Sequence, residues 1–185
     1  MTDRAIPSGL PGEMSAGGGA RGIDVLRPGT PGATIAGYPA SAIADAARHF
    51  EACHPREGCG AIVRMPDGGM EFRPIPNVAQ GPDSFELDPV GQLDLWAAQD
   101  RGEHVIVAIA HSHCEVSAAL SERDREGARL WPGGPLAAGP LDWLVVEVRT
   151  RGGRPKAQEV RVFPWAEGAL VDAAATGCLS ASPDR

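Results

Sequence analysis

The stretch HVIVAIAHSHCEVSAALSERD, residues 104–124, joins a continuous apolar run to two histidines and then to a polar segment. Apolar residues, several of them β-branched, fill positions 105–110, which is typical of a strand buried on both faces in the middle of a sheet. His111 and His113 follow at once, and Ser121 and Asp124 come later. The stretch therefore predicts a central strand that delivers polar side chains at its end.

A first helix is predicted on the N-terminal side of this stretch, within residues 39–55. Ile43, Ala47 and Phe50 recur there at helical spacing, with alanines between them, so they form one apolar face. Pro55 cannot continue a helix and ends the pattern. We expect this helix to pack its apolar face on the sheet.

A second helix is predicted over residues 88–102, immediately before the central strand. Asp88 is a suitable N-cap, Pro89 fits the first helical position, and Gly102 fits just beyond the last turn. The sequence pattern predicts that its buried face consists of Val90, Leu93 and Ala97.

The remaining elements are short and mix strands with helix. Residues 59–65 and 70–75 flank a glycine turn and predict a hairpin, residues 121–130 predict a short charged helix, and residues 141–149 and 157–163 predict two further strands, the second being the last. Strict alternation of strand and helix is missing. The sequence therefore predicts an α/β (α+β) fold with one mixed central sheet flanked by helices.

Length and composition indicate one folded domain with a tail at each end. The chain has 185 residues, of which 43% are hydrophobic, enough for one core. Residues 1–32 contain eight glycines and four prolines, which predicts a flexible tail, and residues 168–185 predict a second tail without periodicity. We expect the domain to span residues 33–167.

Charge and cysteine usage narrow the possible partners and the location. The 17 basic and 24 acidic residues give a net charge of −7, and no basic stripe is present, so a nucleic-acid partner is not expected. We expect no membrane partner and no secretory signal, because apolar runs of the needed length are missing. The four cysteines form no CxxC pair and are interpreted as free thiols. A cytoplasmic location follows as the expectation.

The polar residues after the central strand allow two interpretations. His111 and His113 point to the same side if the strand persists, and Asp124 could fold back as a third ligand, which would leave the fourth position of a catalytic zinc open to water. Alternatively, Ser121 and Asp124 have the spacing of a helix capping box and need no metal. The spacing by itself leaves both interpretations open.

Glu57 offers the base that such a zinc site needs. It precedes a short apolar strand in the segment HPREGCG, where Gly58 and Gly60 allow close backbone approach. A carboxylate held in a partly dry cleft beside a metal can take a proton from water. The alternative is an ordinary solvated acid in a loop.

Taken together, Glu57, the HSH triplet, seven intervening residues, Ser121, two residues and Asp124 resemble the JAMM motif of the MPN+ (Mov34/JAB domain) zinc metalloprotease family, in its compact prokaryotic type. The segments HPREGCGAIV, PNVAQGPDSFELDP and LDWLVVEV resemble its flanks, so the resemblance covers about residues 34–165. It implies a single MPN/JAB-like domain with a cytidine-deaminase-like layout.

The resemblance also implies a role for each residue of the motif. His111, His113 and Asp124 would bind Zn²⁺. Glu57 would take the proton of the attacking water and pass it to the leaving amine, and Ser121 would donate a hydrogen bond to the oxyanion. The implied reaction is hydrolysis of a peptide or isopeptide bond without a covalent intermediate.

Two positions depart from the family pattern. Cys114 and Leu120 stand where many members have proline, so the loop between the ligands is expected to be less rigid. Cys114 could bind metal or sense oxidants, or it could simply fill space.

The resemblance further implies a substrate class. The C-terminal Gly-Gly tail of a ubiquitin-like or sulfur-carrier protein is the leading expectation. A peptidase of cell-wall or phage-tail peptides is one alternative, and a non-catalytic MPN scaffold that only binds partners is another.

Overall fold

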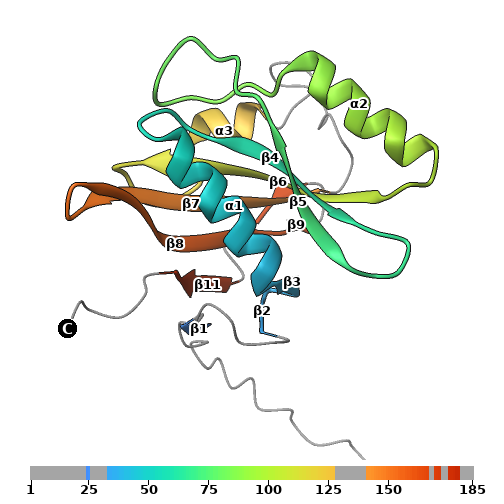
Figure 1. Ribbon diagram of the computed structural model, residues 1–185, viewed down its shortest axis with the longest axis horizontal. Coiled ribbons are helices and arrows are strands. Elements are labelled where there is room, and N and C mark those ends of the chain that lie inside the picture. Colours follow the sequence, from blue (N-terminus) through green and yellow to red (C-terminus); the bar gives the residue numbers. More distant parts are fainter. Residues whose placement is uncertain (1–23, 26–32, 128–140, 167–168, 172–174, 180–185) are drawn as a thin grey trace, which may run out of the picture.

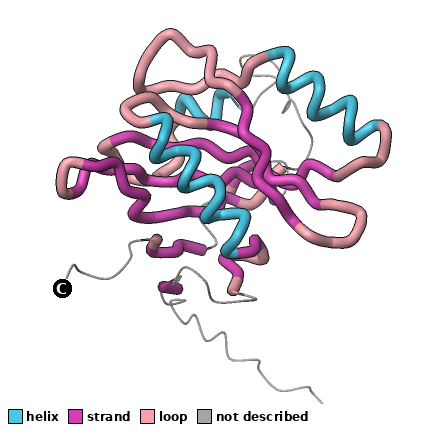
Figure 2. The backbone as a smooth tube through the Cα atoms, viewed as in Figure 1, coloured by secondary structure: helices cyan, strands magenta, loops and turns pink. Residues whose placement is uncertain are grey.

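The computed structural model describes residues 24–25, 33–127, 141–166, 169–171 and 175–179. One mixed sheet of seven strands forms its centre, with α1 on one face and α2 and α3 on the other side (Figure 1). Figure 2 shows the same arrangement by type of element. The elements are β1 (Asp24–Val25), β2 (Thr34–Ile35), β3 (Tyr38–Pro39), α1 (Ala40–Cys53), β4 (Cys59–Arg64), β5 (Met70–Ile75), α2 (Pro89–Asp100), β6 (Val105–Cys114), α3 (Glu122–Gly127), β7 (Asp142–Arg151), β8 (Arg154–Phe163), β9 (Trp165–Ala166), β10 (Ala169–Leu170) and β11 (Ala175–Cys178).

Strand β6 lies in the interior of the sheet, as its apolar sequence predicts. The strand order is β1-β11-β8-β7-β6-β4-β5, and β6 is antiparallel to β4 and parallel to β7. Strands β4 and β5 form the predicted antiparallel hairpin. The predicted α/β (α+β) class with a mixed central sheet is therefore confirmed.

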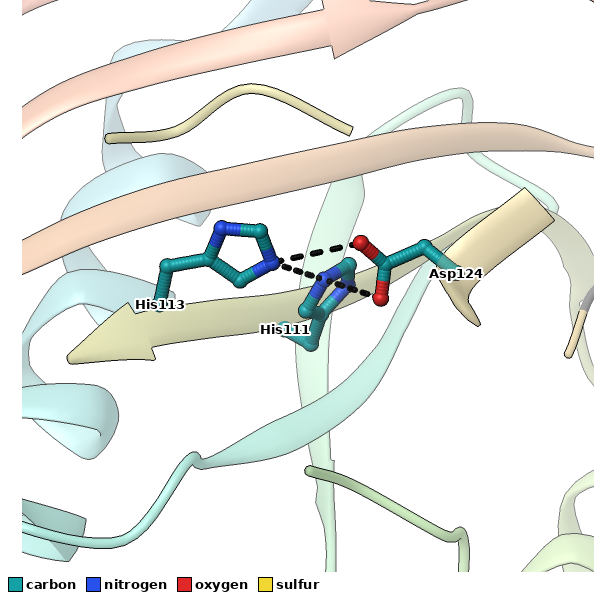
Figure 3. A group of neighbouring side chains, drawn as sticks. All are labelled: His111, His113 and Asp124. Carbon is teal, nitrogen blue, oxygen red and sulfur yellow. Dashed lines mark hydrogen bonds and ion pairs between the residues drawn. The ribbon is translucent and has the colours of Figure 1, made fainter. Parts of the chain in front are cut away.

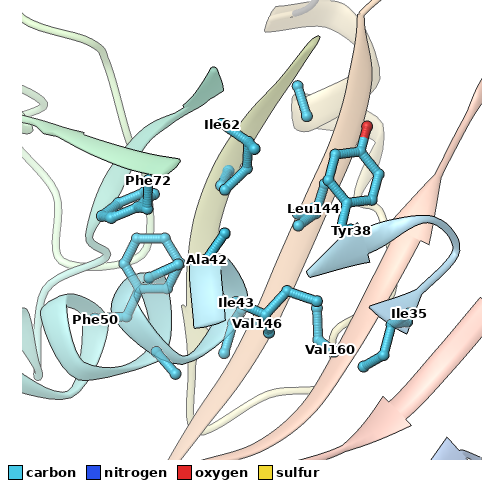
Figure 4. Close-up of a cluster of buried hydrophobic side chains, with 14 of the residues drawn as sticks. Ile35, Tyr38, Ala42, Ile43, Phe50, Ile62, Phe72, Leu144, Val146 and Val160 are labelled. Carbon is cyan, nitrogen blue, oxygen red and sulfur yellow. The ribbon is translucent and has the colours of Figure 1, made fainter. Parts of the chain in front are cut away.

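Helix α1 covers one face of the sheet with the side chains that its periodicity predicts. Ile43, Ala47 and Phe50 are all buried, and Figure 4 shows Ile43 and Phe50 among the strand residues of the core. The Phe50 ring meets the ring of Phe72 edge-on, with centroids 5.5 Å apart. This face is a continuous apolar layer, and the interpretation of α1 is confirmed.

Helix α2 is present, but its predicted buried face is wrong. Its start is as expected, since Asp88 accepts a 2.9 Å hydrogen bond from Gly91 N. However, Val90 and Leu93 are 67% and 69% exposed, whereas Leu95 and Ala98 are buried.

The packed face of α2 is built around a glycine. Gly91, Leu95 and Ala98 are spaced i, i+4 and i+7, and a Cβ at Gly91 would lie 3.1 Å from Ile75 Cγ2. A glycine adds nothing to a hydrophobic pattern, so the helix is rotated away from the face that its larger apolar side chains indicate.

Short strands outside residues 33–167 extend the sheet. Strand β11 pairs antiparallel with β8, so residues 157–163 do not belong to the last strand, and β1 pairs parallel with β11. Most of the two expected tails lies outside the described residues, and their flexibility stays a prediction. The last residues of the helix predicted over 121–130 also lie outside the described residues. Within the described ranges, no helix combines the length and apolar character needed to cross a membrane.

Candidate metal centre

Two histidines and one aspartate converge at the end of β6. The strand runs to Cys114, so His111 and His113 lie on the same side of the sheet, and the first turn of α3 brings Asp124 towards them (Figure 3). All three side chains are buried. The part of the chain that the structure describes contains one group able to hold a metal ion in this way, and it consists of these three residues.

The distances within this group fit a zinc ion. His111 Nε2 lies 3.2 Å from His113 Nε2 and 3.3 Å from Asp124 Oδ1, and His113 Nε2 lies 3.3 Å from Asp124 Oδ2. Ligand atoms at about 2.0–2.1 Å from a tetrahedral zinc lie about 3.3 Å from one another. The two imidazole nitrogens and the Asp124 carboxylate, whose Oδ1 faces His111 and whose Oδ2 faces His113, therefore have spacings close to those of zinc ligands.

The second nitrogen of each imidazole has a different environment. His113 Nδ1 lies 2.8 Å from Ser117 O, so it can donate to this carbonyl and leave Nε2 free to bind metal. His111 Nδ1 is buried and has no hydrogen-bond partner among the described residues. Instead, the His111 ring stacks on Phe85 at 4.3 Å and meets Trp143 edge-on at 5.5 Å. Aromatic packing therefore takes the place of a hydrogen bond on the Nδ1 side of this ring.

The protonation states of His111 and Asp124 favour binding of a cation. Complete burial lowers the pKa of His111 and favours its neutral form, although Asp124 opposes this. Burial disfavours ionisation of Asp124, but hydrogen bonds with His111, His113 and Ser121 outweigh it and hold the pKa of this carboxyl well below its usual range. The carboxylate is therefore charged at neutral pH.

Ser121 caps α3 through Asp124. Its hydroxyl donates to Asp124 Oδ2 at 2.5 Å, its backbone N donates to the same oxygen at 2.7 Å, and Asp124 N donates to Ser121 Oγ at 3.1 Å. This is the reciprocal pattern of a capping box. The capping interpretation and the metal interpretation therefore hold together, because one Asp124 oxygen both accepts from Ser121 and faces His113.

Glu57 lies in the loop before β4 and is 6% exposed. Burial raises the pKa of its carboxyl to about 7, His113 lowers it, and the negative charges of Asp124 and Asp83 raise it further. The Glu57 carboxyl thus interacts electrostatically with His113 and Asp124. Its pKa is that of a group that can exchange a proton near neutral pH. The alternative of a solvated loop acid does not fit this burial.

Ser112 turns away from the metal group, as the alternation of β6 predicts. Its Oγ accepts a 2.8 Å hydrogen bond from Gly58 N, and its backbone N donates to Gly58 O at 3.0 Å. A Cβ at Gly58 would lie 2.6 Å from Phe50 Cδ1, so the residue after Glu57 has no room for a side chain. The middle residue of HSH thus binds the backbone that carries Glu57.

The cysteines beside the site are thiols at neutral pH. Burial, aided by the charge of Glu57, raises the pKa of Cys114 to about 11, and burial raises that of Cys59 to about 12. Cys59 is fully buried and its Sγ lies 3.4 Å from Ile75 O, which supports a packing role. Cys53, Cys59 and Cys114 are free, and the side chain of Cys178 lies outside the described part.

Three histidines lie outside this group. Each has a local polar partner, and the pairs are His49 Nε2 with Cys53 Sγ at 3.5 Å, His54 Nε2 with Glu115 Oε1 at 3.0 Å and His104 Nε2 with Leu95 O at 3.1 Å.

Phe85 and Asn77 were not found from the sequence. Phe85 supports the His111 ring, and Asn77 Nδ2 donates a 2.8 Å hydrogen bond to Glu57 O. Both lie in residues 76–88, a segment whose only sequence signal is its similarity to the flank of the motif.

Comparisons with known proteins identify the family of this chain. The chain matches the family described as prokaryotic homologs of the JAB domain over residues 39–160. It is 31% identical over 126 residues to the CysO-cysteine peptidases of Mycobacterium tuberculosis (strain ATCC 25618 / H37Rv) and Mycobacterium bovis, and the alignment covers 67% of this chain and 78% of each relative.

A solved structure supports the fold alone. The solution structure of a protein from Desulfitobacterium hafniense has a TM-score of 0.51 to this chain and 20% sequence identity, and the match covers 73% of this chain and 87% of that one.

Proposed function

The chain belongs to the prokaryotic JAB-domain family, and on this basis we propose that it is a zinc-dependent metallopeptidase or isopeptidase. The observation that carries the proposal is the convergence of His111 Nε2, His113 Nε2 and the Asp124 carboxylate. The two nitrogens lie 3.2 Å apart, and Oδ1 and Oδ2 lie 3.3 Å from His111 Nε2 and His113 Nε2, respectively. A neutral imidazole, a second imidazole tied to a carbonyl and a charged carboxylate suit Zn²⁺.

The residues around the ligands would carry out the proton transfers. Zinc bound here would polarise the scissile carbonyl and lower the pKa of a water molecule to about 7. Glu57 would accept the proton of the attacking water and return it to the leaving amine, a role that its raised pKa of about 7 suits.

Ser121 would stabilise the negative charge on the carbonyl oxygen. Its hydroxyl donates to Asp124 in the present structure, so it must rotate to donate to the oxyanion. The backbone N of Ser121 also donates to Asp124 and would keep the cap in place during that rotation.

The proposed substrate is the C-terminal tail of a ubiquitin-like or sulfur-carrier protein. The support is the name of the mycobacterial relatives, CysO-cysteine peptidase, with 31% identity across two thirds of this chain. An extended Gly-Gly tail is narrow enough for a site whose ligands are this deeply buried. A cytoplasmic location stays a prediction.

Zinc content and cleavage of a carrier together test the proposal. The full chain should contain about one zinc per chain and should cleave a Gly-Gly-tailed carrier with one added residue. His113→Ala should lose the metal, and Glu57→Gln should keep it while slowing cleavage by about 10²–10⁴-fold. Full metal retention in His113→Ala would exclude this ligand set. Zinc binding without cleavage of any carrier or peptide would favour the non-catalytic scaffold.

A further inference from the structure

The amide of Asn77 uses all of its hydrogen-bonding capacity in one loop. Its Nδ2 donates to Glu57 O at 2.8 Å and to Ser84 O at 3.0 Å. Its Oδ1 accepts from Ala79 N at 2.9 Å and from Glu86 N at 3.0 Å. Three of these bonds fold residues 76–88, the bracket loop, around the side chain, and the fourth attaches the loop to Glu57.

The main chain of Glu57 is fixed by hydrogen bonds, whereas its carboxylate is not. Burial and neighbouring charges, and no hydrogen bond from another described residue, act on the carboxylate of Glu57, so its place depends on the main chain that carries it. Glu57 O accepts from Asn77, and Glu57 N donates to Pro82 O at 3.2 Å. Both main-chain groups of the base are thus bound by the bracket loop.

The same loop supports the first metal ligand. Phe85 lies in the bracket loop next to Ser84, whose carbonyl Asn77 binds, and its ring stacks on His111 at 4.3 Å. This contact is the more important because His111 Nδ1 has no hydrogen-bond partner in the described part. One folded loop therefore contacts the base on one side and a ligand on the other.

We propose that Asn77 is a positioning residue, which sets the place of the Glu57 carboxylate relative to the metal group by folding the bracket loop. The proposal rests on the function proposed above and deepens it. Asn77 touches neither substrate nor metal, and it acts through the backbone of Glu57. Because a displacement of about 1 Å can lower a rate by about 10²-fold, a single amide in this place controls turnover.

The substitution Asn77→Asp tests this role with almost no change of shape. It keeps the oxygen that accepts from Ala79 N and Glu86 N, but it places a charged oxygen against Glu57 O and Ser84 O. We expect kcat to fall about 10- to 100-fold on the Gly-Gly-tailed carrier, with KM and zinc per chain unchanged. In a Glu57→Gln background the same substitution should cause no further loss, because the base that it displaces is already gone.

Gln99→Glu is the matched control. Gln99 is an amide on α2 whose Oε1 accepts a 2.8 Å hydrogen bond from Ile106 N, and the substitution makes the same chemical change at the other end of β6. Its kcat should equal that of the parent protein.

Each other outcome has a definite meaning. An unchanged kcat in Asn77→Asp, or an equal loss in the Glu57→Gln background, would overturn the positioning role and leave the proposed function intact. If Glu57→Gln alone has no effect, the proposed function itself fails. If Asn77→Asp does not fold, the uncharged Asn77→Ser replaces it, and failure of both to fold would show a structural role and overturn the proposal.

Discussion

The two faces of the central sheet are made by the same strands, but they carry different kinds of side chain. On the side of α1, β6 presents Ala108 and Ala110 to a continuous apolar cluster. On the other side it presents Ile109, then His111 and His113, which lie among buried ionisable groups. One strand therefore contributes a dry core with one set of alternate residues and a polar site with the other.

This difference between the two faces separates the residues that stabilise the fold from the residues of the candidate site. Apolar burial on the α1 face favours folding in proportion to the area buried. Burial of a carboxyl such as Glu57, on which the described residues act through charge and not through a hydrogen bond, opposes folding and raises its pKa. The α1 face should therefore control unfolding, and the opposite face should control metal binding and turnover.

The largest expected effect is a loss of stability caused by a substitution on the α1 face alone. Ile43 is fully buried in the apolar cluster, so Ile43→Ala should lower the free energy of unfolding by about 2–5 kcal/mol. Zinc per folded chain should be unchanged, as measured by urea denaturation together with metal analysis of the native protein. Loss of zinc from the folded variant would show that the two faces are not separate.

The next largest effect is a loss of activity caused by a substitution on the opposite face. Ser121→Ala removes the proposed oxyanion donor and should lower kcat by about 10²–10³-fold. It also removes the cap of α3, which should lower the free energy of unfolding by only about 1 kcal/mol. Steady-state kinetics and denaturation of the same preparation check both numbers. A kcat within a few-fold of the parent would contradict the assigned role.

A smaller effect concerns pH and the metal. Burial lowers the pKa of His113, but its hydrogen bonds with Asp124 and Ser117 raise it overall above the usual value. A proton therefore competes with zinc, and affinity should rise with pH until His113 is neutral, by about tenfold per pH unit below that pKa. Calorimetry of the metal-free protein in buffers of different ionisation enthalpy would count the released proton. An affinity that does not change with pH would contradict this expectation.

The smallest effect sharpens the description of α2. Leu93 is 69% exposed, so Leu93→Ala should change the free energy of unfolding by less than about 0.5 kcal/mol. Leu95→Ala, the matched substitution on the packed side of the helix, should lower it by about 2 kcal/mol or more. Equal losses in the two variants would show that the helix is rotated differently.

The two helices show why the sequence predicted one face and missed the other. In α1 the side chains that pack are large and apolar, such as Ile43 and Phe50, so the periodicity reveals them. In α2 the packed face includes Gly91, which lies against Ile75 and contributes no side chain to any pattern.

The site shows the same division. His111, His113 and Asp124 lie within one strand, one loop and one helical turn, so a short stretch of chain brings them together. The resemblance to the family motif predicts them as a group. Asn77 and Phe85 contact residues of other segments, and no short-range pattern marks such contacts.

The sequence by itself determined the central strand and the class of the fold, because these depend on alternation and on apolar patterning within each segment. It also predicted His111, His113 and Asp124 as ligands, through their resemblance to a family motif. Only the tertiary structure decided how the ligand atoms are spaced, which face of α2 packs, and how Glu57 is held by a loop 20 residues later in the chain. The physical reason is that these features arise from contacts between segments, where shape and hydrogen-bond geometry matter more than residue type.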